Sequence, residues 1–293
     1  MFLTYILQMG STPCYIILNW AAITGHFLSA ICMSAILWGR DSLIIPYTES
    51  YLEWTPTNTT CELGSRTFNT SNGVYCIGST TSPVSCDDDE CYGIDLGMLI
   101  ISFHILSFVF QLGAALTDWT GPICGYQYSD MISSNKNPLR FIEYGFSASI
   151  MLIAIALLNG VTDINLITSI AVLTSACQLC GLAVEYVDQN NIKWLLHFTG
   201  WLQFFWAYSI IGHAFFKSID ASNESGGSGP PDFVYIIVIA LFLLYASFGT
   251  VQFAELCIDI DPYKKEISYV SLSLIAKLLL GWMIFSNVLV LSN

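Results

Sequence analysis

Seven long apolar segments constrain the fold of this chain more than any other feature. They cover residues 14–39, 95–117, 138–160, 164–186, 194–217, 233–257 and 267–291. Each is close to the roughly 20 residues that an α-helix needs to cross a bilayer. Of the 293 residues, 54% are hydrophobic and 11% are charged, whereas soluble globular chains carry about 25% charged residues. The sequence therefore predicts an all-α membrane protein whose single domain, residues 1–293, is a bundle of seven transmembrane helices.

The basic residues and the long first loop, residues 40–94, predict the orientation of the bundle. With a cytoplasmic N-terminus, the cytoplasmic side holds Lys136, Arg140, Lys193, Lys264 and Lys265, and the outside holds Arg40, Arg66 and Lys217. An excess of basic residues on the cytoplasmic side is the usual arrangement. We therefore expect the N-terminus in the cytoplasm and both the first loop and the C-terminus outside.

Cysteines and glycosylation motifs in the first loop suit an oxidising exterior. The loop contains Cys61, Cys76, Cys86 and Cys91, with the sequons "NTT" from residue 58 and "NTS" from residue 69. Disulfides and N-glycans both belong to that side of a membrane. We predict two disulfides, whose pairing among three possibilities the sequence leaves open. The alternative is four free thiols and two chance sequons.

Charge and motif content disfavour two classes of function. The net charge is −13, and much of the acidity lies in "CDDDEC", residues 86–91. Nucleic-acid binding requires a basic surface instead. The four histidines are scattered, and neither an HExxH motif nor a CxxC motif in a loop occurs. We expect no nucleic-acid partner, no metal site and no enzymatic activity.

Lys277 is a basic residue in the middle of an apolar segment, "SLSLIAKLLLGWMIF", residues 271–285. A lysine at that depth costs roughly 2.5–3.5 kcal/mol, so it calls for a specific role. It could form a structural ion pair, carry charge in a transport site, or bind an aldehyde as a Schiff base. Ser273 precedes it by four residues and lies on the same helix face, unless its hydroxyl bonds its own backbone.

A carboxylate suited to pair with Lys277 lies in the third segment, in "PLRFIEYGFSASIM", residues 138–151. Ser147 follows Glu143 by four residues and shares its helix face. Arg140 lies three residues earlier, toward the predicted cytoplasmic end. Glu143 is therefore a predicted counterion for a Schiff base, and the alternative is an ion pair between Glu143 and Arg140.

These motifs resemble those of the heliorhodopsins. The resemblance rests on Glu143–Tyr144 followed by "GFSASIM", on the preceding "NPLR", and on "SLSLIAK" in the last segment. Heliorhodopsins are retinal-binding proteins of seven helices whose N-terminus faces the cytoplasm, and the similarity in topology covers the whole chain. The family usually has serines at the positions of Gly145 and Ala148.

The resemblance implies roles for several residues. Lys277 would be the retinal lysine, Glu143 the counterion, and Ser273 a hydrogen-bond partner of the Schiff base. Ser147, on the same helix face as Glu143, is a further predicted hydrogen-bonding group there. His26 and His104 would line a polar cavity, with Arg140 toward its cytoplasmic end. The alternative for each histidine is a buried ring satisfied by a hydroxyl or carbonyl group. The implied cofactor is retinal, all-trans in the dark, and the implied assembly is a homodimer.

Two further groups of residues have predicted roles near the chromophore. The retinal pocket is predicted to include Met151, Trp201, Phe205, Trp206, Phe242 and Tyr245, although aromatic residues at helical spacing also serve ordinary packing. A proton relay near the cytoplasmic helix ends is predicted to include Glu185, His197 and Glu255. The alternative is that these three side chains belong to solvated helix ends.

The leading functional hypothesis is a light-sensing photoreceptor in which retinal isomerisation moves the Schiff-base proton and changes the cytoplasmic side. A light-activated proton channel or transporter is the second hypothesis. The third is a receptor or transporter without retinal, in which Lys277 is only an ion-pair charge. Membrane lipids and an unidentified cytoplasmic signalling protein are the expected partners.

Overall fold

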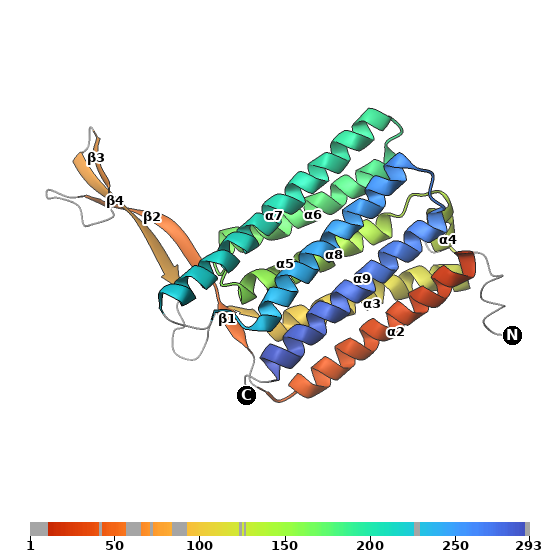
Figure 1. Cartoon of the computed structure of the whole chain (residues 1–293), viewed down its shortest axis with the longest axis horizontal. Coiled ribbons are helices and arrows are strands. Elements are labelled where there is room, and N and C mark those ends of the chain that lie inside the picture. Colours follow the sequence, from red (N-terminus) through yellow and green to blue (C-terminus); the bar gives the residue numbers. More distant parts are fainter. Residues whose placement is uncertain are drawn as a thin grey trace.

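Seven long helices lie side by side in the computed structural model of the chain, and a strand region projects from one end of them (Figure 1). The structure describes residues 11–40, 43–56, 66–70, 73–83, 93–122, 125, 127–225 and 229–290. The long helices are α2 (Ser11–Leu37), α3 (Leu96–Thr120), α5 (Pro138–Leu158), α6 (Ile164–Tyr186), α7 (Asn190–Glu224), α8 (Asp232–Cys257) and α9 (Pro262–Ile284). A short helix, α4 (Tyr128–Ser133), precedes α5, and a π-helical turn, η1 (Phe285–Leu289), continues α9.

Six helices of the described residues are long and apolar enough to cross a membrane: α2, α3, α5, α6, α8 and α9. The remaining long helix, α7, has 35 residues and lies beside α6 and α8 in the bundle (Figure 1). It carries charged residues at both ends, including Lys193, Lys217 and Asp220. All seven predicted segments are therefore helices of one bundle, which accounts for the membrane class inferred from composition.

Polar caps and prolines explain where several helices begin. Pro138 stands in the first turn of α5, after Asn137, whose side chain accepts a hydrogen bond from the backbone of Arg140. Pro262 starts α9 in the same way, after the capping residue Asp261. Proline suits this position because its missing N–H is not needed there. α9 thus begins before the predicted residue 267, because the charged stretch around Lys265 is helical and buried.

The turn between α5 and α6 is tight and contains a second helix cap. Gly160 has φ +80°, a conformation that favours glycine. The carboxylate of Asp163 accepts hydrogen bonds from the backbone nitrogens of Asn165 and Leu166, at 2.8 and 3.2 Å. A hydrogen bond from Ser50 and these backbone donors lower the pKa of Asp163. The short "NGVTD" connection therefore separates two helices.

The first loop contains strands, so the prediction of an all-α protein was incomplete. β1 (Ile44–Pro46) pairs antiparallel with β5 (Gly93–Asp95). β2 (Thr48–Pro56), β4 (Gly73–Pro83) and β3 (Arg66–Thr70) form a second antiparallel sheet in the order β2-β4-β3. The stretches "TESYLEWTP" and "GVYCIGSTTSP" are rich in threonine, tyrosine and valine, which favour strands. These strands lie between the first two apolar segments, in a loop for which we predicted no secondary structure.

The second sheet is attached to the bundle at the α5–α6 turn, where the backbone nitrogen of Thr48 donates to the carbonyl of Thr162 at 2.8 Å. Of the four loop cysteines, Cys76 lies in β4 and is disulfide-bonded. Cys61, Cys86 and Cys91 lie outside the described residues, so the predicted pairing stays a prediction.

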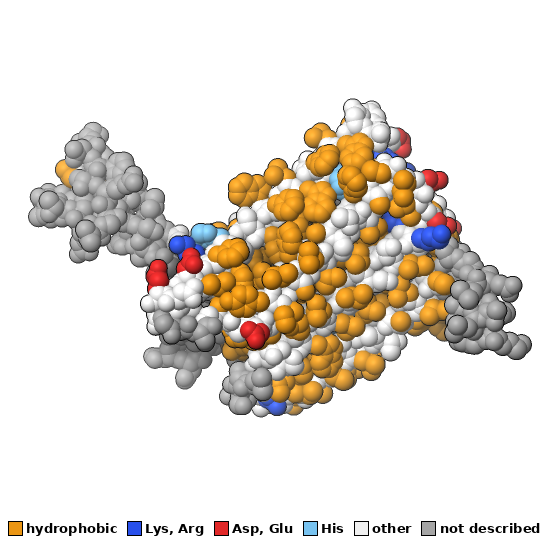
Figure 2. Space-filling model, viewed as in Figure 1, with side chains coloured by type: hydrophobic (Ala, Val, Ile, Leu, Met, Phe, Trp, Pro, Cys, Tyr) orange, Lys and Arg blue, Asp and Glu red, His pale blue; other side chains and the backbone are white. Residues whose placement is uncertain are grey.

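Apolar side chains cover the outside of the helical body, and charged side chains gather near its two ends (Figure 2). Phe146, Val172 and Leu202 are each more than half exposed. Several charged side chains are instead buried, among them Lys277, Glu143, Arg140 and Glu266. Lipid-facing helices with polar groups turned inward are typical of integral membrane proteins.

Candidate functional site

A buried ion pair joins α9 to α5 in the middle of the bundle. Lys277 is 3% exposed, and its Nζ lies 2.5 Å from Oε1 of Glu143. Ser107, on α3, donates to the same oxygen at 2.6 Å and accepts from Lys277 at 2.5 Å. We call the ion pair of Lys277 and Glu143 the inner pair, and Ser107 is the serine that bonds both of its side chains. Glu143 therefore pairs with Lys277 and not with Arg140, and its role as a Schiff-base counterion stays a prediction.

The two charged side chains meet although they stand at different distances from their helix starts. Lys277 lies 15 residues after Pro262, or roughly 22 Å, and Glu143 lies five residues after Pro138, or roughly 7.5 Å. Side chains on a helix lean toward its N-terminus, so the lysine stem leans toward the level of Glu143. α9 also begins nearer this end of the bundle than α5 does. Glu266 lies four residues into α9 and pairs with Arg140, which lies only two residues into α5.

Two predicted serines lie close to this lysine. Ser147 and Ser273 are buried and line the same cavity as Lys277. Within the described residues, neither hydroxyl has a hydrogen-bond partner. The ring of Tyr144 lies 5.2 Å from Lys277 Nζ, and its hydroxyl donates to the backbone of Tyr269. The inner pair is therefore surrounded by hydroxyl groups that have unused hydrogen-bonding capacity.

The predicted histidines form a pair between α2 and α3. His26 Nδ1 and His104 Nδ1 are 3.0 Å apart, and both rings are fully buried. One of the two must donate and the other accept, so at least one Nδ1 carries a proton. The His104 ring packs against α9 at Gly281, where an added Cβ would lie 2.5 Å from His104 Nε2. Ser107 follows His104 by three residues on α3, which places the histidine pair next to the inner pair.

A cavity lies beside Lys277, which is one of its lining residues. Its lining comes from α5, α6, α7, α8 and α9 and is mostly apolar and aromatic, with Leu152, Phe204 and Phe248 as examples. Met151, Trp201 and Tyr245, which the sequence predicted, also line it. Such a cavity could hold a long apolar molecule with one end at Lys277.

Three of the predicted pocket aromatics lie outside this lining. Trp206 is 61% exposed and Phe205 is half exposed, so both face outward. Trp206 follows Trp201 by five residues, which turns it to another face of α7. Phe204, three residues after Trp201, lines the cavity instead. Phe242 stacks on the Phe204 ring and is not itself part of the lining. Helical spacing from Trp201 does not separate Phe204 from Phe205, because residues three and four positions further on both lie on its side of the helix.

His197 also lines this cavity. Its Nε2 accepts a hydrogen bond from Trp201 Nε1 at 2.9 Å, and its Nδ1 is 3.2 Å from Gln252 Oε1. Gln252 in turn donates to the carbonyl of Gly181 at 3.0 Å. Since the ring must accept at Nε2 and donate at Nδ1, His197 is neutral in this arrangement. Both ring nitrogens are engaged, which does not favour the predicted relay role.

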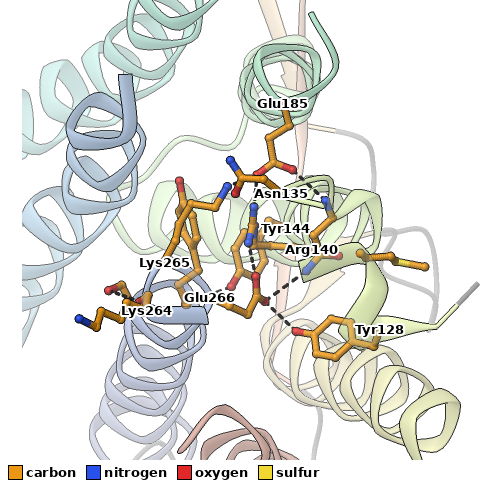
Figure 3. Close-up of polar contacts among 12 residues, drawn as sticks. Tyr128, Asn135, Arg140, Tyr144, Glu185, Lys264, Lys265 and Glu266 are labelled. Atoms are coloured by element: carbon orange, nitrogen blue, oxygen red, sulfur yellow. Dashed lines mark hydrogen bonds and ion pairs between the residues drawn. The ribbon is translucent and has the colours of Figure 1, made fainter. Parts of the chain in front are cut away.

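A second cluster of buried charges lies at the end of the bundle where α9 begins. Lys265 Nζ is 2.9 Å from Glu185 Oε1 and 3.0 Å from Glu255 Oε1. Arg140 pairs with both Glu185 and Glu266. Figure 3 shows Arg140 between these two carboxylates, with Lys265 on the other side of Glu185. We call Arg140, Glu185, Glu255, Lys265 and Glu266 the end network.

Polar neighbours surround the end network. Tyr128 donates to Glu266 at 2.7 Å, and Asn137 donates through its backbone to Glu185 and through its side chain to Glu266. Asn135 donates to Glu255 at 2.5 Å. Burial, and then the negative charge and hydrogen bond of Glu266, raise the pKa of Tyr128 well above its ordinary value. The tyrosine hydroxyl therefore keeps its proton, which it shares with Glu266.

Three residues that the sequence singled out, Arg140, Glu185 and Glu255, belong to the end network. Arg140 does not line a cavity with the histidines, because both its partners are carboxylates of the end network. Glu185 is buried, which contradicts the alternative of a solvated helix end, and both Glu185 and Glu255 pair with Lys265. Their relay role stays a prediction. Neither Lys265 nor Glu266 was recognised, because the last segment was expected to start at residue 267. A helix cap at Asp261 was the sequence signal that could have revealed them.

Fold and site together define a class of protein: a membrane-embedded helical bundle with one lysine paired to a carboxylate beside an apolar, aromatic cavity. The heliorhodopsin family model matches residues 17–289, nearly the whole chain. The chain belongs to the heliorhodopsin family, as its motifs suggested. Membership in this family implies a bundle of seven helices and a retinal chromophore. No curated protein sequence matches the chain.

Proposed function

We propose that this protein is a light-sensing photoreceptor that binds retinal through a protonated Schiff base at Lys277, with Glu143 as the counterion. The observation that carries the proposal is the 2.5 Å contact between Lys277 Nζ and Glu143 Oε1 beside the apolar cavity. Family membership supports a retinal-binding, light-sensing rhodopsin. The assignment of individual residues is our proposal.

The residues around Lys277 suit retinal. The polyene and ring of retinal are long and apolar, and the cavity has Met151, Leu152, Trp201, Phe204 and Tyr245 in its lining. The same nitrogen that pairs with Glu143 would carry the chromophore. When bound, retinal supplies absorption of visible light and isomerisation of a double bond.

The chain's own residues would then hold and move a proton. Glu143 stabilises a positive charge on the Lys277 nitrogen, and Ser107 holds the Glu143 carboxylate by a hydrogen bond. The free hydroxyls of Ser147 and Ser273 can accept or pass on a proton in the same space. Loss of the proton from the nitrogen would end its attraction to Glu143 and loosen α9 from α5.

A shift of α9 would reach the end network, because α9 carries both Lys265 and Glu266. This helix therefore links the inner pair to the end of the bundle, which we take to be cytoplasmic. A cytoplasmic N-terminus, an all-trans chromophore in the dark, a homodimer and a cytoplasmic signalling partner complete the proposal.

Proton conduction is the second function, and one observation favours it. His26 and His104 form a buried, hydrogen-bonded pair next to Ser107, so a chain of titratable groups starts beside the inner pair. The end network argues for sensing, because Glu185 and Glu255 are engaged in ion pairs with Lys265.

Reconstitution followed by electrical recording tests both functions. Membranes that contain the protein should gain a visible absorption band after all-trans-retinal is added. Under voltage clamp, illuminated cells should show no steady photocurrent. Absence of the band would contradict retinal binding. A sustained current that reverses with the proton gradient would instead establish conduction, and its loss in Glu185→Gln or Glu255→Gln would locate the path.

A further inference from the structure

A groove between α2 and α3, which shares no lining residue with the cavity at Lys277, has the chemistry of a ligand site. It has a volume of about 380 Å³ and lies where α2 begins and α3 ends. Its lining consists of Tyr15, Ile16, Asn19, Trp20, Ala115, Asp118 and Trp119. Asp118 is the charged residue among these seven, so the groove favours a cation over an anion.

The polar groups of the groove are arranged as acceptors. The Asp118 carboxylate accepts from the Tyr15 hydroxyl at 2.6 Å and from the backbone nitrogen of Ser129 at 2.8 Å. A carboxylate has about four acceptor positions, so two stay available. Asn19 is 3% exposed and donates to the carbonyl of Gln111 at 3.4 Å, but its own Oδ1 has no donor among the described residues. A buried amide oxygen without a donor is uncommon and indicates a missing hydrogen-bond partner.

The apolar part of the groove faces the lipid. Trp119 is 77% exposed, and Trp20 and Ile16 are each about two-fifths exposed. The two tryptophan rings approach edge to face, with centroids 6.5 Å apart. Tryptophans concentrate where a membrane meets water, and their faces attract cations. A ligand here would have an apolar portion in the bilayer and a positive group at Asp118.

We propose that this groove binds a membrane lipid with a primary ammonium headgroup, of the phosphatidylethanolamine type. Three N–H donors on such a headgroup match the open positions of Asp118 and the unpartnered oxygen of Asn19. A choline headgroup has the same charge but no N–H donor, so it would leave both oxygens unsatisfied. An anionic headgroup would be repelled by Asp118.

A lipid competition experiment on the full-length protein tests this proposal. Purified protein is equilibrated with equal amounts of phosphatidylethanolamine, its N-methyl and N,N-dimethyl derivatives, phosphatidylcholine and phosphatidylglycerol, all with the same acyl chains. Native mass spectrometry then counts the lipids retained. Retention should fall stepwise with each methyl group, and phosphatidylethanolamine should exceed phosphatidylcholine about tenfold, the size of one charge-assisted hydrogen bond. Equal retention of the two lipids would overturn the proposal.

Two variants locate the site. Asp118→Asn keeps an acceptor for Ser129 and should abolish the preference for phosphatidylethanolamine. Asp130→Asn is the matched control, because Asp130 is exposed on the neighbouring α4 and outside the groove. It should keep the preference. A preference that survives in Asp118→Asn, or disappears in Asp130→Asn, would exclude this groove. Thermal unfolding of each variant verifies the fold, and the methylation series on the unmodified protein stands even if Asp118→Asn does not fold.

Discussion

The inner pair and the end network are both buried clusters of opposite charges, yet their construction differs. The inner pair has one cation and one carboxylate, and unpartnered hydroxyls of Ser147 and Ser273 lie nearby. The end network has two cations and three carboxylates. It connects α5, α6, α8 and α9, whereas the inner pair connects α5 and α9 and reaches α3 through Ser107.

The number of partners per charge distinguishes the two clusters. Glu185 accepts from Arg140, Lys265 and the backbone of Asn137, so loss of one donor leaves others. Glu143 has only Lys277 and Ser107 among the described residues. A change of charge at Lys277 therefore alters most of the environment of Glu143. The comparison suggests that the inner pair is built to change state and the end network to hold helices together.

The sharpest test of the comparison is to remove the lysine of each cluster. Lys277→Ala should abolish the visible absorption band, because no other lysine of the described residues lines the cavity. Lys265→Ala should keep the band, since Lys265 belongs to the end network. Absorption spectra after addition of retinal give the result. Lys277→Arg preserves a positive charge opposite Glu143 and serves as a folding control that also lacks the band. A visible pigment in Lys277→Ala would contradict the assignment.

The carboxylates provide the second test. Glu143→Gln should shift the absorption maximum to longer wavelength, because less positive charge is held at the Lys277 nitrogen. The midpoint pH at which the visible band is lost should fall by about 2 units, within the range of about 1–3 for a nearby opposite charge. Spectra recorded across pH provide both values. Glu143→Asp should change them much less, and Glu185→Gln should leave them unchanged. If Glu185→Gln shifted the absorption maximum and the midpoint pH as Glu143→Gln does, the functional distinction between the inner pair and the end network would be contradicted.

Removal of Arg140 should show the stabilising role of the end network. Arg140→Ala leaves Glu266 without its buried cation and leaves Glu185 with Lys265 alone, and we expect a loss of about 3–5 kcal/mol in the free energy of unfolding. The absorption maximum should not move. Denaturant unfolding in detergent, followed by helix content, measures the loss. Lys264→Ala is the matched control, because Lys264 is exposed next to Lys265 and should change stability by less than about 0.5 kcal/mol.

The smallest effect is expected at the edge of the end network. Tyr128→Phe removes the hydrogen bond to Glu266 and should cost about 1–2 kcal/mol. The pKa of Tyr128 is raised in the folded protein, so its contribution is complete below the ordinary value of 10.0 and is lost as the pH rises above that value. Unfolding measured at pH 8 and pH 11 should therefore show a smaller alkaline loss in Tyr128→Phe. Tyr186→Phe, at a half-exposed position, is the control, and an equal alkaline loss in both variants would contradict this role.

Much of the candidate site was visible in the sequence because a charge in an apolar segment is conspicuous. Lys277 and Glu143 stand in long hydrophobic stretches, where their cost demands a partner. His26 and His104 were conspicuous for the same reason, and the structure brings them together. Ser107 was missed, since a serine in a membrane helix is ordinary until its neighbours are known. Phe204 was missed because adjacent aromatic residues hide which one faces inward.

The sequence by itself determined the membrane class, the seven helical segments, the family and the central lysine, because these depend on composition and on spacing along one chain. Only the tertiary structure decided which charges pair. Arg140 and Glu143 are three residues apart on α5, yet they join different clusters, since each reaches a different level of α9. Lys265 and Glu266 resemble an exposed helix start in the sequence, and their burial depends on carboxylates and cations from three other helices. Contacts between distant segments depend on how helices are offset and rotated, and no local pattern records that geometry.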